Sequence, residues 1–332
     1  MTAATGSAAS PARMFVLAPG PHLHAAQDTA SIMWWVNGAL APVVAWGAFV
    51  FGWHALAVVA AAIAGATAAE WGALRLLRRR ATVADGSAVC TGLLLALTLP
   101  PLVPPWMALL GGVFSILIGK MIFGGLGYNL FNPALVGRAF MMASFPLAMT
   151  AGWATPRAGI GAPLAAVTTA TPLAVLKEQG LEAALRLIPG NTWAGLALGF
   201  RPGSIGEVSL VLVAFGAALL VARGIIRLTI PLSVLTGTFL TTAFTGAPLL
   251  HLMSGGLWLG AFFMATDYVT SPTTRGGQIA FGLTVGALTG MIRVFGGYPE
   301  GICYAILIAN ALAPAFDLWF PTRRIRLAGV PS

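Results

Sequence analysis

Residues 119–138 read GKMIFGGLGYNLFNPALVGR, a polar and glycine-rich stretch inside an otherwise apolar sequence. In a lipid bilayer every backbone N–H and C=O needs an internal partner, so a broken helix persists only against protein or a polar cavity. Glycine and proline supply the unusual backbone, while asparagine, lysine and arginine supply polar groups. In transporters such breaks point to a binding site. A tight turn between two membrane spans is the alternative, and the local residues leave both interpretations open.

The composition predicts a polytopic membrane protein. Of 332 residues, 58% are hydrophobic and only 8% are charged, whereas soluble domains carry about a quarter charged residues. The formal net charge of the chain is +9. The arginines that supply most of this charge are scattered between apolar segments, which favours positively charged cytoplasmic loops over nucleic-acid binding. The two cysteines are too few to ligate an iron–sulfur cluster within this chain, and buried free thiols are expected.

Ten apolar segments are candidates for membrane spans, each of which needs about 20 mostly apolar residues. They cover approximately residues 31–51, 54–77, 86–101, 105–122, 131–147, 208–222, 225–245, 249–266, 278–295 and 301–319. With both termini in the cytoplasm, the arginines between spans fall in cytoplasmic loops, as the positive-inside rule requires. The expected division is a cytoplasmic tail, a first membrane repeat, a long outer loop, a second membrane repeat and a second cytoplasmic tail. These parts cover residues 1–28, 29–147, 148–205, 206–320 and 321–332.

The two membrane parts share short strings at one offset. Phe123-Gly124-Gly125 recurs 172 residues later as Phe295-Gly296-Gly297, and Thr98-Leu99-Pro100 pairs with Thr270-Ser271-Pro272 at the same offset. Because five spans is an odd number, two such halves are inverted relative to each other, and sites form where inverted halves meet. A chance match of short glycine- and proline-rich strings is the alternative.

Polar residues near the predicted helix ends are further candidates. Residues 171–188 have apolar residues at helical spacing, which predicts an amphipathic helix with Pro172 in its first turn and Thr171 as its cap. The acidic residues Glu70 and Asp317 lie close to span ends, where they either reach the interface or serve a function. Residues 267–274 combine a carboxylate, hydroxyls and a proline, and a capping loop is the simpler interpretation.

Taken together, several strings resemble the family that contains the D component of the Rnf complex and the B component of the sodium-pumping NADH:quinone oxidoreductase. The strings are Asp85–Ala88, Leu93–Pro101, Phe123–Asn129, Phe131–Ala134, Pro202–Glu207, Ala261–Asp267, Thr270–Pro272 and Phe295–Gly301. The resemblance extends from about residue 19 to about residue 320. The N-terminal tail is shorter than is usual for the sodium-pumping relative, which favours the Rnf-type branch of the family.

The resemblance implies an all-α, urea-transporter-like fold of about ten helices and a covalently bound FMN. Family members attach FMN through its phosphate to a threonine within a Ser/Thr-Gly-Ala-Thr pattern, which corresponds here to Thr168-Thr169-Ala170-Thr171. Thr171 keeps the acceptor position, while Thr169 replaces the usual glycine. The resemblance also implies a second, non-covalent flavin, riboflavin, which we expect between the two halves, near the two FGG strings. Further cofactor-binding candidates are Gly124, Gly125, Asn129, Asn132, Arg138, Gly203, Ser204, Gly206, Glu207, Asp267, Ser271 and Thr273; no catalytic or metal-ligating residue is expected.

The implied function is an electron relay between NADH and ferredoxin-type carriers, coupled to movement of Na⁺ or H⁺. The implied partners are other Rnf-type membrane and periplasmic subunits, including a second FMN-bearing subunit, and a flavin transferase for maturation. The expected location is the bacterial inner membrane, with the Thr171 loop in the periplasm. Two alternatives stay open: a flavin-free channel or transporter for small solutes, and the quinone-reducing B component of the sodium-pumping enzyme.

Overall fold

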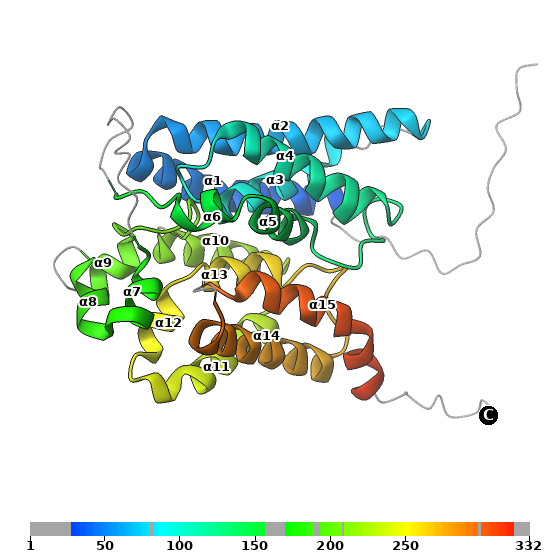
Figure 1. Ribbon diagram of the computed structural model, residues 1–332. Helices are drawn as coiled ribbons and strands as arrows, with labels where there is room; N and C mark the ends of the chain where they lie inside the picture. The colour runs from blue at the N-terminus through cyan, green and yellow to red at the C-terminus, as the bar shows by residue number, and fades with distance from the viewer. Residues whose placement is uncertain are drawn as a thin grey trace, which may run out of the picture.

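The computed structural model describes residues 28–79, 83–156, 170–188, 193–207, 209–297 and 300–321, whose regular elements are helices (Figure 1). The first half contains α1 (Thr29–Phe51), α2 (Trp53–Leu76), α3 (Ser87–Thr98), α4 (Pro105–Ile116), a first π-helix (Leu117–Met121), α5 (Pro133–Ser144) and α6 (Pro146–Ala151). The connecting part contains α7 (Pro172–Gln179), α8 (Leu181–Arg186) and α9 (Trp193–Leu198). The second half contains α10 (Leu210–Ala222), α11 (Thr229–Thr242), α12 (Pro248–Met253), α13 (Leu257–Leu259), a second π-helix (Gly260–Met264), α14 (Arg275–Phe295) and α15 (Ile302–Trp319).

The described residues confirm an all-helical architecture with membrane-spanning character. Four helices, α1, α2, α14 and α15, are long and apolar enough to cross a membrane. Shorter apolar helices cover Ser87–Thr98, Pro105–Met121, Leu210–Ala222 and Thr229–Thr245. The remaining predicted spans are therefore shorter or broken pieces rather than full-length helices.

Two predicted helices are interrupted by glycines with positive φ. The segment expected as one span over 249–266 is divided between α12 and α13, where Gly255 and Gly256 have φ of 72° and 64°. The expected helix over 171–188 is likewise wrong as a single element, because Gly180, with φ of 86°, separates α7 from α8. Glycine adopts this left-handed backbone at little cost, so both breaks are built into the sequence.

Close helix packing follows the same scheme in both halves. In the first half α2 packs against α4, and in the second α11 packs against α14. A Cβ atom at Gly112 would lie 2.3 Å from the carbonyl oxygen of Ala62, and one at Gly286 would lie 2.3 Å from that of Val234. Small residues at these crossings let the backbones approach, as is usual for helices packed within a membrane.

The bundle has two ends, which we name after one residue of each. At the Thr171 end lie α7, α8 and α9, on the left of Figure 1, where Trp46 Nε1 donates to the Leu198 carbonyl at 3.1 Å. At the Arg79 end, where α2 and α15 finish, Arg79 Nη1 donates to the Gly124 carbonyl at 2.9 Å.

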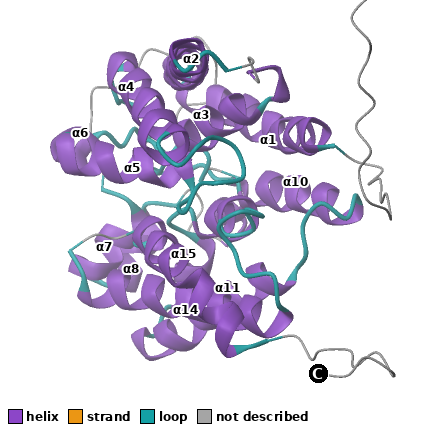
Figure 2. Cartoon of the chain, turned by 90° about the vertical axis from the view of Figure 1, so that its right-hand side faces the viewer, coloured by secondary structure: helices purple, strands orange, loops and turns teal. Residues whose placement is uncertain are grey.

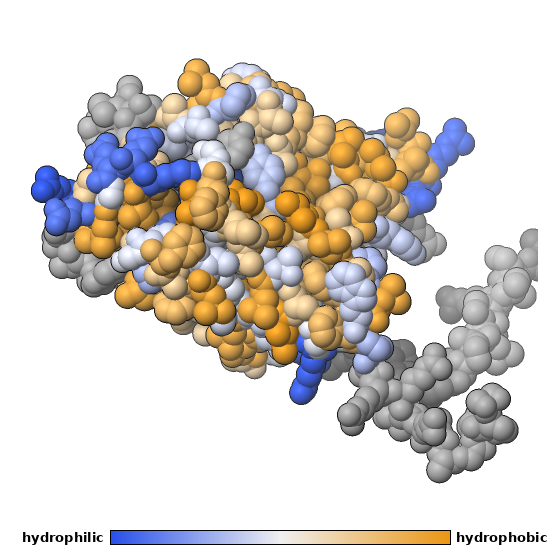
Figure 3. Space-filling view, turned by 60° about the horizontal axis from the view of Figure 1, so that its bottom comes forward, coloured by the Kyte–Doolittle hydropathy of each residue, from blue (hydrophilic) through white to orange (hydrophobic). Residues whose placement is uncertain are grey.

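Apolar side chains occupy the surface between these ends. Hydrophilic residues gather toward the ends of the face in Figure 3, and hydrophobic residues cover its middle. Exposed apolar residues on the helices include Leu56, Leu109, Phe215, Leu232, Leu240 and Ile308. In Figure 2, α1 to α5 lie in the upper part and α11, α14 and α15 in the lower part, while α10, from the second half, packs against α1.

Candidate functional site

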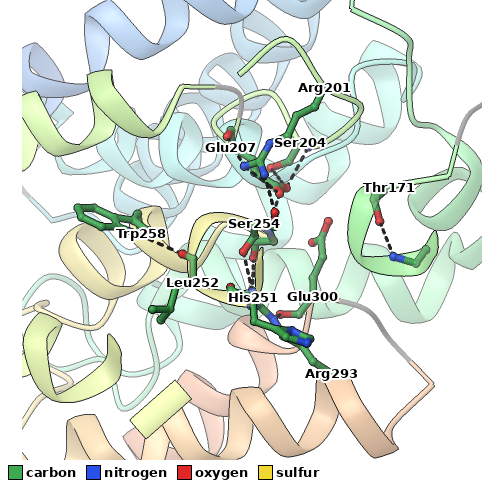
Figure 4. A network of polar contacts seen from close by, with 12 residues as sticks. Thr171, Arg201, Ser204, Glu207, His251, Leu252, Ser254, Trp258, Arg293 and Glu300 are labelled. Carbon is green, nitrogen blue, oxygen red and sulfur yellow. Dashed lines mark hydrogen bonds and ion pairs between the residues drawn. The ribbon is translucent and has the colours of Figure 1, made fainter. Parts of the chain in front are cut away.

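Thr171 caps a helix at the Thr171 end of the bundle. It is the N-cap of α7, its Oγ1 accepts a hydrogen bond from the Ala174 N–H at 3.3 Å, and only 4% of the residue is exposed (Figure 4). Pro172 occupies the first helical position, where its missing N–H costs nothing. The predicted cap is thus confirmed. Thr168 and Thr169 lie outside the described residues.

A buried loop, residues 201–207, contacts the break between α12 and α13. Arg201 Nη1 donates to Ser254 Oγ at 2.6 Å, and its Nη2 lies 3.5 Å from Glu207 Oε1. The Glu207 carboxylate also accepts from the backbone N–H of Gly255 and from Ser204 Oγ, the latter at 3.4 Å. Burial lowers the pKa of Arg201, and the neighbouring Glu207 opposes that shift. The carboxylate and guanidinium therefore hold this loop on the helix break.

The same loop also contacts the first half. The backbone N–H of Gly206 donates to the Leu97 carbonyl at 2.7 Å, and that of Ile205 donates to the Leu99 carbonyl at 3.1 Å. A Cβ atom at Gly206 would lie 2.7 Å from that of Leu97, so only glycine fits this approach. Gly203, Ser204, Gly206 and Glu207, predicted as cofactor-binding residues, thus lie where the two halves of the bundle meet.

Two further arginines complete this polar network. The Arg293 guanidinium, on α14, donates to the carbonyls of His251, Ser254 and Gly255, the last two at 2.9 and 3.1 Å. Arg138, on α5, pairs with Glu300 and also donates to the Thr98 carbonyl. In the view of Figure 4, Arg293 lies below Ser254 and His251, and Glu300 lies between Ser254 and Thr171. Sequence reasoning did not select Arg293, although a basic residue inside an apolar helix is a functional candidate by default.

The surroundings of Thr171 fit a phosphate group. A pocket along α7 is lined by Leu173, Lys177, Gly180, His251 and Arg293, among others, and Thr171 lies next to it in sequence without lining it. The positive end of a helix dipole and two cationic side chains are the groups that bind phosphate esters in proteins. These groups come from α7, α12 and α14, so the site depends on both the connecting part and the second half.

A second candidate site lies at the Arg79 end, in a cavity between the two halves. Its volume is about 100 Å³, and it is partly open to solvent. We name it the central cavity. Its lining includes Ile32, Met33, Ser87, Cys90, Leu94, Lys120, Leu126, Asn129, Asn132, Leu220, Ile225, Phe262, Phe263 and Asp267. Three predicted residues, Asn129, Asn132 and Asp267, are thus brought together here.

Asn132 and Asp267 shape the wall of the central cavity. Asn132 caps α5 through its side-chain oxygen, and its Nδ2 donates to the Met264 carbonyl at the end of the second π-helix, at 3.2 Å. Asp267 accepts from Thr270 Oγ1 at 3.2 Å. Burial raises the pKa of Asp267, and hydrogen bonds from Val269, Thr270 and Asn129 oppose that shift.

A buried ion pair closes one side of the central cavity. Lys120 Nζ lies 2.7 Å from Glu70 Oε1 and 2.6 Å from Ser87 Oγ, and both charged residues are at most 2% exposed. Glu70 therefore does not extend to the interface. Asp317, in contrast, caps the loop before α14 by accepting from the N–H groups of Thr273 and Thr274 at 3.0 Å.

The other predicted residues lie apart from both sites. Gly124 and Gly125, with φ of 116° and 111°, form the turn after the first π-helix and are not among the residues that line the central cavity. Ser271 and Thr273 line a neighbouring pocket with Arg227. The predicted residues therefore divide into a group at the Thr171 end and a group at the Arg79 end.

Comparison with known proteins places the chain among components of electron-transport complexes. A family model described as the NQR2, RnfD, RnfE family matches residues 16–326.

Three similar relatives are each named as the D component of an oxidoreductase complex. The first, from the proton-translocating ferredoxin:NAD(+) oxidoreductase complex of Clostridium ljungdahlii, is 44% identical over 326 residues, which cover 94% of this chain and 97% of that protein. The second, from the Na(+)-translocating ferredoxin:NAD(+) oxidoreductase complex of Acetobacterium woodii, is 44% identical over 301 residues, covering 90% and 91%. The third, from the ion-translocating oxidoreductase complex of Stutzerimonas stutzeri, is 40% identical over 316 residues, covering 86% and 89%.

Proposed function

The chain belongs to the NQR2, RnfD, RnfE family, and from this we propose that it is the D-type membrane component of an ion-translocating ferredoxin:NAD⁺ oxidoreductase complex. The observation that carries the proposal is the near full-length similarity to relatives named as the D component of such complexes. One of these relatives is named for protons and the other for Na⁺, so the similarity is compatible with either ion. The same names favour this function over the B component of the sodium-pumping quinone reductase.

We further propose that Thr171 carries FMN through a phosphodiester bond, attached by a flavin transferase. Support comes from the position of Thr171 at the N-terminus of α7, the helix that contributes Leu173 and Lys177 to a pocket also lined by Arg293. FMN would supply one- and two-electron transfer, and its attachment to the chain would keep it at a fixed distance from redox centres in neighbouring subunits.

The residues around Thr171 would position this group. Arg293 and Lys177 place positive charge near the ester, and the α7 N-terminus adds backbone N–H groups. Arg201 and Glu207 hold the neighbouring loop against Ser254 and Gly255, which keeps the second-half wall of the pocket in place. The chain's own task is thus to bind and orient the cofactor.

A second, non-covalent flavin, riboflavin, is proposed for the central cavity. The cavity combines apolar and aromatic walls with a few buried polar groups, as pockets for cofactors usually do. Both π-helices contribute to its lining, through Lys120 and through Phe262 and Phe263, and such helices are frequent at functional sites.

The proposed topology places the Arg79 end in the cytoplasm and the Thr171 end in the periplasm of a bacterial inner membrane. Arginines at helix ends and on short connections gather at the Arg79 end, at Arg75, Arg78, Arg79, Arg223, Arg227 and Arg275. Such a bias sets the orientation of membrane proteins. The repeated packing of α2 on α4 and α11 on α14 supports two related, inverted halves.

In-gel fluorescence tests the covalent flavin directly. The chain is co-expressed with a flavin transferase, denatured and separated on a gel, and its band is illuminated for flavin fluorescence. We expect a fluorescent band for the wild type and for Thr171→Ser, and a dark band for Thr171→Ala at equal protein level. A dark wild-type band would favour a flavin-free transporter, and a fluorescent Thr171→Ala band would move the attachment elsewhere.

A further inference from the structure

We propose that Lys120 is the residue that binds the carbonyl edge of a planar ring ligand in the central cavity. The inference rests on the proposed second flavin, and it assigns to one side chain the task of orienting that ligand.

The ammonium group has more donors than its protein partners use. A lysine side chain has three N–H donors. Among the described residues, the Lys120 Nζ has two acceptors, Glu70 Oε1 at 2.7 Å and Ser87 Oγ at 2.6 Å. Lys120 is 2% exposed and lines the central cavity. Because a buried donor without an acceptor is costly, the third N–H provides a binding contact for a ligand in this cavity.

The neighbours of Lys120 keep its ammonium in place. Ser87 Oγ accepts from Lys120 and donates its own proton to Asp85 Oδ1 at 2.5 Å. Glu70, on α2, is 1% exposed, and its carboxylate forms an ion pair with the Lys120 ammonium group. Lys120 lies in the first π-helix, which directly follows α4. The ammonium is thus fixed by α2, by the start of α3 and by its own helix.

The walls of the cavity define the class of ligand. Met33, Leu94, Phe262 and Phe263 provide apolar and aromatic surface, which suits the faces of a planar ring. A positively charged donor at the cavity wall suits a carbonyl oxygen at the ring's edge. An isoalloxazine and a quinone share this chemistry, so the ligand is a planar ring with carbonyl acceptors, and riboflavin is the form that the proposed function names.

The test measures the ring ligands retained by the intact complex. Wild-type and variant complexes are purified with identical washes, and an acid-solvent extract of each is quantified for riboflavin and for quinone. A charge-assisted hydrogen bond contributes enough affinity that Lys120→Met should weaken retention about tenfold or more. Lys120→Arg, which keeps a positively charged donor, should restore part of it. Arg186→Met is the control, because it removes an exposed positive charge from α8, at the opposite end of the bundle, and should retain the ligand as the wild type does.

Folding is monitored separately through the flavin at Thr171. Fluorescence of the denatured band and assembly of the complex report on a folded chain, since Thr171 lies at the other end. If Lys120→Met alone does not assemble, Lys120→Met combined with Glu70→Gln removes both charges together and should assemble without the ring ligand.

The possible outcomes distinguish the role of Lys120 from the presence of a second flavin. An assembled Lys120→Met complex that keeps wild-type riboflavin overturns the role of Lys120 and leaves the second flavin standing. A wild-type complex that contains a quinone and no riboflavin overturns the second flavin. In that case, loss of the quinone in Lys120→Met still supports the role of Lys120. A wild-type complex with neither ligand overturns both.

Discussion

Arg138 and Asn310 lie 172 residues apart, and each donates to a backbone carbonyl 40 residues before it. Arg138 Nη1 donates to the Thr98 carbonyl. With the nitrogen of its side-chain amide turned toward Thr270, Asn310 donates to the Thr270 carbonyl at 3.2 Å. The offset is the same as that between the two FGG strings. Thr98 ends α3, and Thr270 lies in the loop between the second π-helix and α14, so each donor contacts a carbonyl in its own half. This correspondence supports the internal repeat.

Replacing Arg138 should destabilise the bundle strongly. Arg138→Met leaves the Glu300 carboxylate buried without its partner, and breaking such a pair from one side costs about 3–5 kcal/mol. Combining Arg138→Met with Glu300→Gln should cost much less than the two single changes added together, because no unpaired charge remains. Thermal unfolding of the purified variants measures both effects. Additive losses would mean that the two side chains do not interact.

The glycine at the α2–α4 crossing should resist enlargement. A Cβ atom at Gly65 would lie 2.2 Å from the Leu109 carbonyl oxygen, whereas one at Gly72, on the same helix, would have no atom within 4 Å. Gly65→Ala should therefore cost about 1–3 kcal/mol through overpacking. Gly72→Ala, the matched control, should be neutral or stabilise by up to about 1 kcal/mol. Melting temperatures in detergent distinguish the two, and equal melting temperatures would contradict the packing at Gly65.

The fold class could be predicted from the sequence because hydrophobicity and charge are properties of whole segments. The predicted spans at 31–51, 54–77, 278–295 and 301–319 correspond to α1, α2, α14 and α15. The segment over 249–266 could not be resolved in the same way. Its average hydrophobicity is high, while Gly255 and Gly256 change the backbone direction locally.

The candidate sites were harder to predict because they depend on contacts between distant segments. The cap at Thr171 followed from its neighbours along the chain. The ion pair of Lys120 with Glu70 joins residues that are 50 positions apart. The contacts of Arg293 with the carbonyls of His251 and Ser254 join residues about 40 positions apart. One sequence shows that such buried charges exist, but not which partners meet them. Only the fold brings Lys120 and Asp267 to one cavity.

The orientation of the bundle should follow its arginines. A phosphatase active only in the periplasm, fused after Gly180 at the Thr171 end, should be active, and the same enzyme fused after Arg79 should be inactive. A second reporter that works only in the cytoplasm, fused at the same two positions, serves as the control and should give the opposite pattern. Activity of the periplasmic reporter at Arg79 alone would reverse the proposed topology.

Substituting Thr171 with asparagine should separate its two roles. Asparagine caps helices as well as threonine does but has no hydroxyl to form a phosphoester, whereas alanine loses the cap at a cost of about 1 kcal/mol. Thr171→Asn should therefore show no covalent flavin fluorescence and a thermal stability close to that of the unflavinylated wild type. Thr171→Ala should lack fluorescence and be less stable, and Thr171→Ser should retain both properties. Each variant is compared with wild type expressed without the flavin transferase, which removes any contribution of the flavin to stability. Fluorescence retained by Thr171→Asn would show that the flavin is attached to another residue.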